Sequence, residues 1–343
     1  MIKPNQPKVS PIKDDDLKQA LQTSINGHCG TACTITQLQR NVFRYSSSFV
    51  IEELDVVLDN GDRLVLLFKD LGNPVLLEKV KMTKPAFMSN PIREIEVYRH
   101  LLANDPMGTA GFFGSVCNTR EKQFWLFLEK VNGLELYQFG DFEIWLKVAQ
   151  WLAQFQNRFS VPPRELASGV PLLNYDREFY LAWPGRVKAF LHDRSESVIN
   201  IKSWLDDHYE VLVEHLMGLP VTLLHGDFNA SNIIVQQTAR SLRICPVDWE
   251  MAALGPGLID LAALISGNWS ADQRTALARA YLGEIQKSGQ YPAGEQKFLE
   301  DLNYCQLHLA MQWLGWSRNW SPPSEHKQDW LQRAIDLTEQ IGL

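Results

Sequence analysis

Two polar side chains in the second half of the chain could take part in phosphoryl transfer. Asp227 and Asn232 stand five positions apart, shortly after the apolar residues Leu223 and Leu224. A carboxylate can orient an attacking hydroxyl and accept its proton, while an amide oxygen can bind the metal ion that accompanies a nucleoside triphosphate. A tight loop that carries both residues therefore predicts a catalytic role for Asp227 and a metal-binding role for Asn232.

A second predicted metal ligand, Asp248, comes sixteen residues after Asn232. Two short apolar segments, 233–235 and 242–244, lie between them and read as the strands of a hairpin. Such a hairpin would return Asp248 to the neighbourhood of Asn232. Because Mg²⁺ prefers carboxylate and carbonyl oxygens and keeps part of its hydration shell, these two side chains and the phosphate oxygens would suffice to hold it.

Residues 225–232 and the segment around Asp248 resemble the catalytic loop and the metal-binding segment of the aminoglycoside phosphotransferase, choline kinase and protein kinase superfamily. Gly226 stands where protein kinases carry an arginine, which points to the small-molecule branch. The resemblance implies an α+β, protein-kinase-like bilobal fold with a small antiparallel β-sheet N-lobe and a mainly helical C-lobe. It also implies ATP or another nucleoside triphosphate, Mg²⁺ and a small-molecule hydroxyl acceptor as ligands.

Two further positions relate the chain to this superfamily. Asp260 matches an aspartate that, in relatives, opens a helix and holds the catalytic loop through hydrogen bonds to its backbone; a simple helix cap is the alternative interpretation. Gln156 marks a departure, because relatives commonly carry Leu-Ala-x-x-His on the long helix after the hinge and this chain ends the same pattern in glutamine. The departure concerns helix packing near the loop more than the phosphoryl chemistry.

The N-terminal part of the chain offers residues for gripping a triphosphate. Lys69 ends an apolar strand, as the nucleotide-clamping lysine of the superfamily does, although a lone strand-end lysine is usually just solvated. The family's Arg-Glu-x-x-x-Tyr pattern makes Glu94 its predicted partner. Glu96 stays open as an alternative, because the periodicity of the segment cannot decide between the two.

The resemblance also places a loop over the phosphates and a hinge against the base. The loop falls at 44–49, where Ser46, Ser47 and Ser48 could donate hydrogen bonds to phosphate oxygens; a polar hairpin turn is the alternative interpretation. The hinge includes Glu129 and Val131, whose backbone groups would face the nucleotide base. Only the position of the hinge is implied, because backbone contacts require no particular side chain.

The elements that must position these residues divide the chain into two parts. Strands are expected within 34–71, 112–116 and 123–131, and a helix is expected at 90–102. Asn132 and Gly133 break this pattern. We therefore expect an N-terminal nucleotide-binding lobe of five strands and one helix at 1–130. A helical C-terminal lobe at 131–343 would carry the catalytic loop, the metal site and the acceptor site.

The charge distribution limits the classes of partner. The net charge is −7, whereas a nucleic-acid-binding protein would present a basic surface. Residues 1–130 carry 16 Lys+Arg against 15 Asp+Glu, and residues 131–343 carry 17 against 25, so the second part is the acidic one. Acidic residues near a cleft would attract a cationic substrate or Mg²⁺. The sequence has no P-loop and no dinucleotide-binding fingerprint.

Composition also leads to an expectation about location. No stretch approaches the roughly 18 consecutive apolar residues of a membrane span, and the first residues are too polar for a signal peptide. The five cysteines are scattered, which fits reduced thiols. We therefore expect a cytoplasmic protein that binds neither membrane nor nucleic acid, and the oligomeric state stays open.

The acceptor is left open by the sequence. In relatives it binds between the catalytic loop and the C-terminal helices, where this chain carries Trp313, Trp316, Trp320 and Trp330. Aromatic faces beside acidic residues suit a cationic or sugar-like ligand, while helical spacing makes core packing the expected role of at least one tryptophan. A catalytically silent nucleotide-binding or protein-interaction module of the same fold is the alternative to an enzyme.

Overall fold

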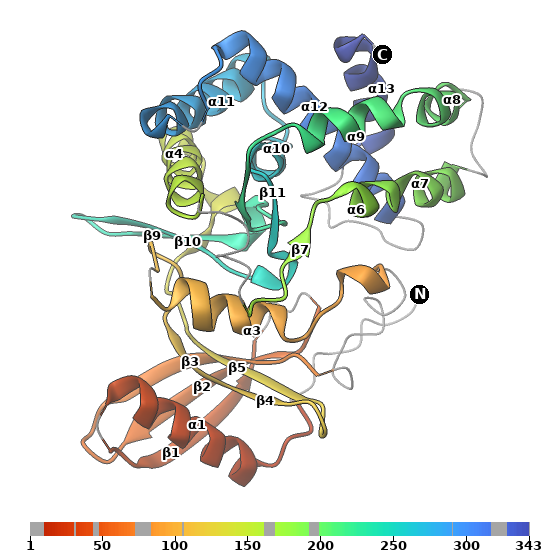
Figure 1. The fold of residues 1–343 in the computed structure, drawn as a ribbon. Coiled ribbons are helices and arrows are strands. Elements are labelled where there is room, and N and C mark those ends of the chain that lie inside the picture. Colours follow the sequence, from red (N-terminus) through yellow and green to blue (C-terminus); the bar gives the residue numbers. More distant parts are fainter. Residues whose placement is uncertain are drawn as a thin grey trace, which may run out of the picture. The chain divides into compact units, whose positions relative to one another are not determined.

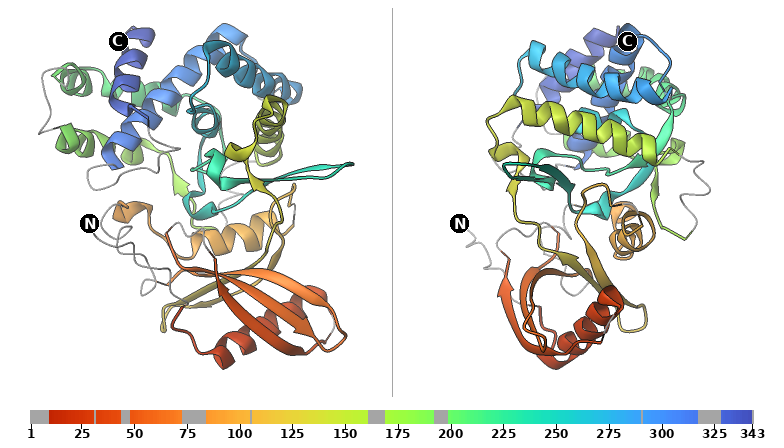
Figure 2. Two further views of the ribbon diagram at one scale, coloured as in Figure 1. Left: turned by 180° about the vertical axis from the view of Figure 1, so that it is seen from behind. Right: turned by 90° about the vertical axis from the view of Figure 1, so that its left-hand side faces the viewer.

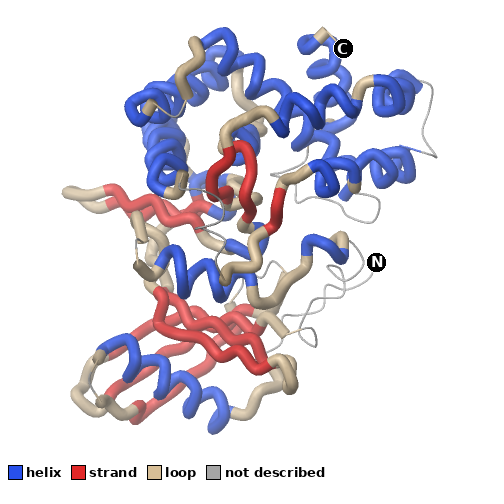
Figure 3. The backbone as a smooth tube through the Cα atoms, viewed as in Figure 1, coloured by secondary structure: helices blue, strands red, loops and turns tan. Residues whose placement is uncertain are grey.

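The computed structural model describes residues 10–30, 32–43, 48–72, 84–104, 106–160, 169–191, 199–289, 291–316 and 328–342. They form two compact units. Unit 1 consists of Met1–Met82, Ser89–Gly133 and Gln236–Glu250, and unit 2 consists of Thr83–Met88, Leu134–Val235 and Met251–Leu343. Most strands belong to unit 1 and most helices to unit 2 (Figure 3). The predicted α+β class, with an antiparallel five-stranded sheet and a helical remainder, is confirmed.

Unit 1 is built around this sheet, whose strand order is β1-β2-β3-β5-β4 (Figure 1). All neighbouring strands run antiparallel. Its strands are β1 (Ile35–Val42), β2 (Ile51–Leu58), β3 (Arg63–Asp70), β4 (Phe112–Asn118) and β5 (Gln123–Glu129). Its other elements are helix α1 (Asp14–Cys29), helix α3 (Arg93–Val97), which continues as a π-helical turn η3 (Tyr98–Leu102), and strand β10 (Leu242–Pro246).

Helix α1 was not expected from the sequence, where the first predicted element begins at residue 34. Leu17, Leu21 and Ile25 recur every four residues, so they share one helix face, and all three are fully buried. They pack against the sheet face that carries Leu54 and Phe68. Figure 2 shows this helix along the sheet from two further directions. Successive strand residues point to opposite faces, so Lys69 projects away from α1.

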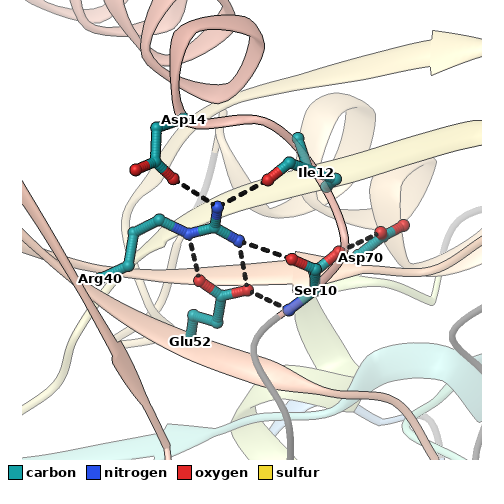
Figure 4. A network of polar contacts seen from close by, with 6 residues as sticks. All are labelled: Ser10, Ile12, Asp14, Arg40, Glu52 and Asp70. Atoms are coloured by element: carbon teal, nitrogen blue, oxygen red, sulfur yellow. Dashed lines mark hydrogen bonds and ion pairs between the residues drawn. The ribbon is translucent and has the colours of Figure 1, made fainter.

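A network of polar contacts fixes the segment before α1 to the sheet (Figure 4). Arg40 on β1 donates to both carboxylate oxygens of Glu52 on β2, at 2.7 and 2.8 Å, and Glu52 is fully buried. Ser10 connects two strands, because its N–H donates to Glu52 and its hydroxyl donates to Asp70 on β3. Arg40 also donates to the Ser10 carbonyl and to the Asp14 carboxylate.

Unit 2 is mainly helical. Its helices are α4 (Phe142–Arg158), α6 (Arg177–Leu181), α7 (Trp183–Leu191), α8 (Ile199–Asp207), α9 (Tyr209–Met217), α10 (Leu258–Leu264), α11 (Ala271–Ile285), α12 (Glu295–Trp316) and α13 (Trp330–Ile341). Its short strands are β6 (Leu134–Glu135), β7 (Leu173–Asn174), β8 (Val221–Leu224) and β11 (Ala253–Pro256), and β9 (Ile233–Gln237) begins in unit 2 and ends in unit 1. Short 3₁₀ turns are η2 (Ala86–Met88), η4 (Leu136–Gln138), η6 (Ala230–Asn232) and η8 (Gln286–Ser288), and η7 (Trp249–Met251) spans the boundary between the units.

Short strands in unit 2 frame the loop that holds Asp227. Strand β8 leads into the loop and pairs with β11, where Leu224 lies opposite Ala253. Strand β9 leads out of it and pairs with β6, where Val235 lies opposite Leu134. Because each end of the loop is fixed in a β-ladder, its backbone has little freedom.

Among the described residues, no helix combines the length and apolar character that a membrane crossing needs.

Candidate active site

One group of predicted site residues lies within unit 1, and we call it the lysine cluster: Lys69, Glu94 and Asp248. The Lys69 ammonium lies 2.7 and 3.0 Å from the two carboxylate oxygens of Glu94 and 2.8 Å from Asp248 Oδ1. Glu96, the alternative partner, instead contacts Arg99 and His100 on its own helix. The structure therefore pairs Lys69 with Glu94.

The lysine cluster is held by charge. Burial alone would lower the pKa of the Lys69 ammonium, but the carboxylates of Asp248 and Glu94 more than offset this and raise it above its ordinary value. Lys69 therefore stays protonated across the physiological pH range. Asp248 has a left-handed backbone with φ of 69°, which is uncommon outside glycine and concentrates at functional sites.

Glu250 joins the phosphate-loop segment to the residues around Asp248, and sequence reasoning assigned it no role. The Ser48 hydroxyl donates to Glu250 Oε1 at 2.7 Å, and the Arg93 guanidinium donates to the Glu250 carbonyl at 2.6 Å. Ser46 and Ser47 lie outside the described residues. Only the order Asp-x-Glu after the strand could have drawn attention to Glu250, and that signal is weak without its partners.

The predicted hinge is fastened by an arginine that the sequence did not reveal. Arg243 on β10 donates to both carboxylate oxygens of Glu129 at 2.7 Å and to the carbonyls of Gly108 and Thr109 at 2.8 Å. The Glu129 N–H donates to the Gly111 carbonyl. The Glu129 side chain and N–H are thus engaged within the protein, so the proposed contact with a nucleotide base rests on backbone groups nearer Val131.

A second group of predicted site residues lies within unit 2, and we call it the loop cluster: Asp227, Asn229, Asn232 and Asp260. The Asn232 amide donates at 2.9 Å to both the carbonyl and the carboxylate of Asp227, and the Asn229 amide donates to the other carboxylate oxygen. Both oxygens of the half-buried Asp227 side chain therefore have fixed directions. The predicted base and the predicted metal ligand share one hydrogen-bonded loop.

Position 226 requires a glycine for steric reasons that become visible only in the structure. Its φ is 80°, in the left-handed region that favours glycine. A Cβ atom there would lie 2.1 Å from the Met251 carbonyl oxygen, far inside van der Waals contact. No other residue type fits this position without displacing the loop, which gives a physical reason for a glycine immediately before Asp227.

Asp260 at the start of α10 holds the backbone of the loop. Its carboxylate accepts hydrogen bonds from the N–H groups of His225, at 2.7 Å, and Gly226, at 3.0 Å. Burial raises the pKa of this carboxyl to about 7, although both N–H groups oppose the shift. Asp260 therefore contacts the loop through its side chain and does more than cap a helix.

The donor chemistry of the two predicted metal ligands fits Mg²⁺. Asp248 offers a carboxylate that is 15% exposed. Asn232 donates its amide N–H groups to Asp227, which directs its carbonyl oxygen elsewhere. One carboxylate and one amide oxygen are the ligand types that a hard cation prefers, with phosphate and water oxygens completing its shell. The two residues belong to different units, and each fits the ion by its own chemistry.

The C-terminal tryptophans mostly pack against other rings. Trp313 and Trp330 stack with ring centroids 5.7 Å apart, and Trp316 stacks on the fully buried Trp183. Trp320 lies outside the described residues. These contacts give Trp313 a packing role, whereas the exposed ring of Phe87, packed edge-on to Trp183, extends the aromatic surface of unit 2 to solvent.

The sequence from residue 81 to residue 295 matches the model of a family described as a phosphotransferase enzyme family. A choline kinase from Cryptosporidium parvum is similar in structure, with 13% identity and a TM-score of 0.56, over 96% of this chain and 94% of that one. The choline kinase LicA from Streptococcus pneumoniae has 12% identity and a TM-score of 0.57, over 95% and 99%. Comparison with curated proteins gives no match.

A third similar structure is the GDP and kanamycin complex of APH(2")-IIIa, with 14% identity and a TM-score of 0.53, over 93% of this chain and 97% of that one. Identities this low establish a common fold and nothing finer. Together with the family match, they confirm the resemblance that residues 225–232 and the segment around Asp248 suggested.

Proposed function

Because this chain belongs to the phosphotransferase enzyme family, we propose that it transfers the γ-phosphoryl group of a nucleoside triphosphate to a hydroxyl group of a small molecule. The observation that carries the proposal is the loop cluster, in which Asn232 and Asn229 hold the carboxylate of Asp227 by both oxygens. A carboxylate with fixed directions is suited to orienting an acceptor hydroxyl and taking its proton.

Each residue has a role in this proposal. Lys69 grips the α- and β-phosphates, and Glu94 holds its ammonium in place. Asn232 and Asp248 would hold Mg²⁺, which when bound neutralises charge on the phosphates. Asp227 aligns the hydroxyl with the γ-phosphorus. Because the transition state of phosphoryl transfer is loose, positioning and electrostatics supply most of the acceleration, and Asp227 need not be a strong base.

The nucleotide is proposed to be ATP or GTP. The hinge contacts the base through backbone groups near Val131, and the GDP complex of a similar structure gives a reason to test guanine beside adenine. Ser48 is proposed to help cover the phosphates, because its hydroxyl, now on Glu250, could turn to a phosphate oxygen.

The acceptor is proposed to be a cationic or sugar-like metabolite. The acidic balance of residues 131–343 favours a cation, and the aromatic surface near Phe87 and Trp316 suits either class. Kanamycin in one similar structure carries both amino groups and sugar rings. We include compounds with amino groups and sugar rings among the proposed acceptors for this reason.

A direct test measures nucleoside diphosphate release by the purified protein. The assay supplies Mg·ATP or Mg·GTP with a panel of amino alcohols, aminoglycosides and sugars, and uses the Asp227→Asn variant as the matched control. We expect acceptor-dependent release in the wild type that the variant lacks. A wild type that binds nucleotide but phosphorylates no compound would instead favour the catalytically silent module.

A further inference from the structure

Gln156 on α4 is a fully buried side chain whose polar atoms meet the support of the catalytic loop. Its amide nitrogen donates at 3.0 Å to the Gly257 carbonyl, which also accepts from the Asp260 N–H at 3.2 Å, and hydrogen bonding from the Gln156 side chain lowers the pKa of the Asp260 carboxyl. Its amide oxygen accepts from the Tyr281 hydroxyl of α11 at 2.5 Å. The Gln156 amide thus faces Gly257, Asp260 and Tyr281, and its two N–H groups and one lone pair of its oxygen match these partners.

A histidine, the residue common in relatives at this position, could not make the same set of contacts. A neutral imidazole has one donor and one acceptor, and a protonated imidazole has two donors and no acceptor. Only a primary amide offers two donors and an acceptor in this space. Glutamine and Tyr281 therefore belong together, because Tyr281 supplies the donor that the amide oxygen requires.

The packing around this pair leaves no room for another arrangement. A Cβ atom on Gly257 would lie 2.5 Å from the Gln156 amide oxygen and 3.1 Å from the Tyr281 hydroxyl. The main chain of Gln156 is fixed as well, since its carbonyl accepts from the Thr222 hydroxyl at 2.9 Å. Thr222 lies on β8, the strand that leads into the loop, so α4 contacts both the loop's entry strand and its anchoring aspartate.

We propose that Tyr281 and Gln156 are positioning residues for phosphoryl transfer, which act by orienting the Asp260 carboxylate toward the N–H groups of His225 and Gly226. The proposal rests on the function proposed above. Hydrogen bonds run from the Tyr281 hydroxyl to the Gln156 amide and on to the Gly257 carbonyl, which also accepts from the Asp260 N–H. The Asp260 carboxylate in turn accepts from the backbone next to Asp227. A change at Tyr281 would therefore tilt the direction of the Asp227 carboxylate without touching a nucleotide.

The principal variant is Tyr281→Phe, and its matched control is Tyr291→Phe. Both remove a buried tyrosine hydroxyl that donates to a side-chain oxygen in unit 2, but Tyr291 donates to Asp301, which does not contact the loop. The amides of residues 222–228 are followed by hydrogen exchange in the full-length protein without ligand. We expect exchange at His225 and Gly226 to accelerate about tenfold in Tyr281→Phe and to stay unchanged in the control.

Turnover provides a second readout, with Mg·ATP and whichever acceptor the panel identifies. Tyr281→Phe should lower kcat severalfold and leave KM for ATP unchanged, because the nucleotide groups lie elsewhere. Gln156→His keeps one donor and one acceptor, so its loss should be smaller than that of Gln156→Leu. This graded series also replaces Tyr281→Phe as the test if that variant does not fold.

Three results would overturn the proposal. They are unchanged exchange at residues 222–228 in Tyr281→Phe, equal changes in both tyrosine variants, or equal losses in Gln156→His and Gln156→Leu. Failure of the proposed function gives a different result, namely a wild type without turnover. Hydrogen exchange needs no substrate, so it can still be compared between that wild type and the Tyr281→Phe variant. Loop positioning and enzyme activity are therefore tested separately.

Discussion

The lysine cluster and the loop cluster are stabilised by different kinds of interaction. In the first, a buried ammonium is balanced by two carboxylates, so the arrangement depends on opposite charges. In the second, the Asp260 carboxylate accepts from neutral donors, namely two backbone N–H groups. Removing a partner from the first leaves an unpaired charge, whereas removing a partner from the second changes geometry. A charged cluster is suited to binding phosphate groups, whereas a hydrogen-bonded cluster is suited to orienting the Asp227 carboxylate.

The largest effect should come from breaking the charge balance. Lys69→Ala leaves Glu94, whose side chain is 1% exposed, without its cation, and an unpaired buried charge costs about 3–5 kcal/mol of unfolding free energy. The double variant with Glu94→Ala should be little worse in turnover than either single change, because paired residues are non-additive. Denaturant unfolding and kcat/KM measure both effects.

The matched control is Lys130→Ala, which removes a more exposed ion pair with Glu53 in the same unit. It should cost no more than about 1 kcal/mol. Fully additive losses for Lys69 and Glu94 would show that the two do not act as a pair.

The second effect concerns chemistry in the loop cluster. Asp227→Asn keeps the shape of the side chain but removes the proton acceptor, so kcat should fall by roughly 10²-fold or more. Nucleotide affinity should not change, because the proposed contact is with the acceptor. Calorimetric titration with a non-hydrolysable ATP analogue measures affinity beside turnover. A variant that turned over like the wild type would remove Asp227 from the mechanism.

A third comparison separates geometry from packing. Gly226→Ala should cost more than the roughly 1 kcal/mol of left-handed strain alone, because its Cβ would also meet the Met251 carbonyl. Gly61→Ala is the matched control, since Gly61 has φ of 88° but open space around it. Thermal unfolding of both variants measures the difference. Equal shifts in melting temperature would mean that the loop relaxes around the methyl group.

The last effect is a pH dependence at Asp260, which appears gradually over several pH units. Its pKa of about 7 in the folded protein lies above the ordinary 3.8, so its contribution to stability is present below the lower value and is lost as pH rises through the higher one. Within that window the contribution falls by about 1.4 kcal/mol per pH unit. Asp260→Asn should remove this slope from the curve of unfolding free energy against pH. An unchanged slope would assign it to other groups.

The sequence predicted what depends on short spacings and missed what depends on long-range packing. Strands were expected within 34–71, 112–116 and 123–131, and β1 to β5 lie at these places. Helix α1 was missed although Leu17 and Leu21 have helical spacing, because the residues around them are mostly polar and the sheet that covers its apolar face begins only at Ile35.

The candidate site shows the same limit. The partner of Lys69 was narrowed to two glutamates on one helix, and only the three-dimensional arrangement pairs it with Glu94. Arg243 carried no signal, because it binds Glu129 across more than a hundred positions of sequence. The proposed domain boundary at 130/131 and the functional roles of the site residues stay predictions.

The network around Arg40 sets a limit on how far the N-terminus can be shortened. A chain that began at Lys13 would lose the Ser10 N–H on the buried Glu52, and the Ser10 hydroxyl on Asp70. Asp70 follows Lys69 directly on β3, so the loss would occur next to the residue proposed to grip the phosphates. Protein engineers should therefore retain Ser10 in any shortened version and attach fusion partners ahead of it.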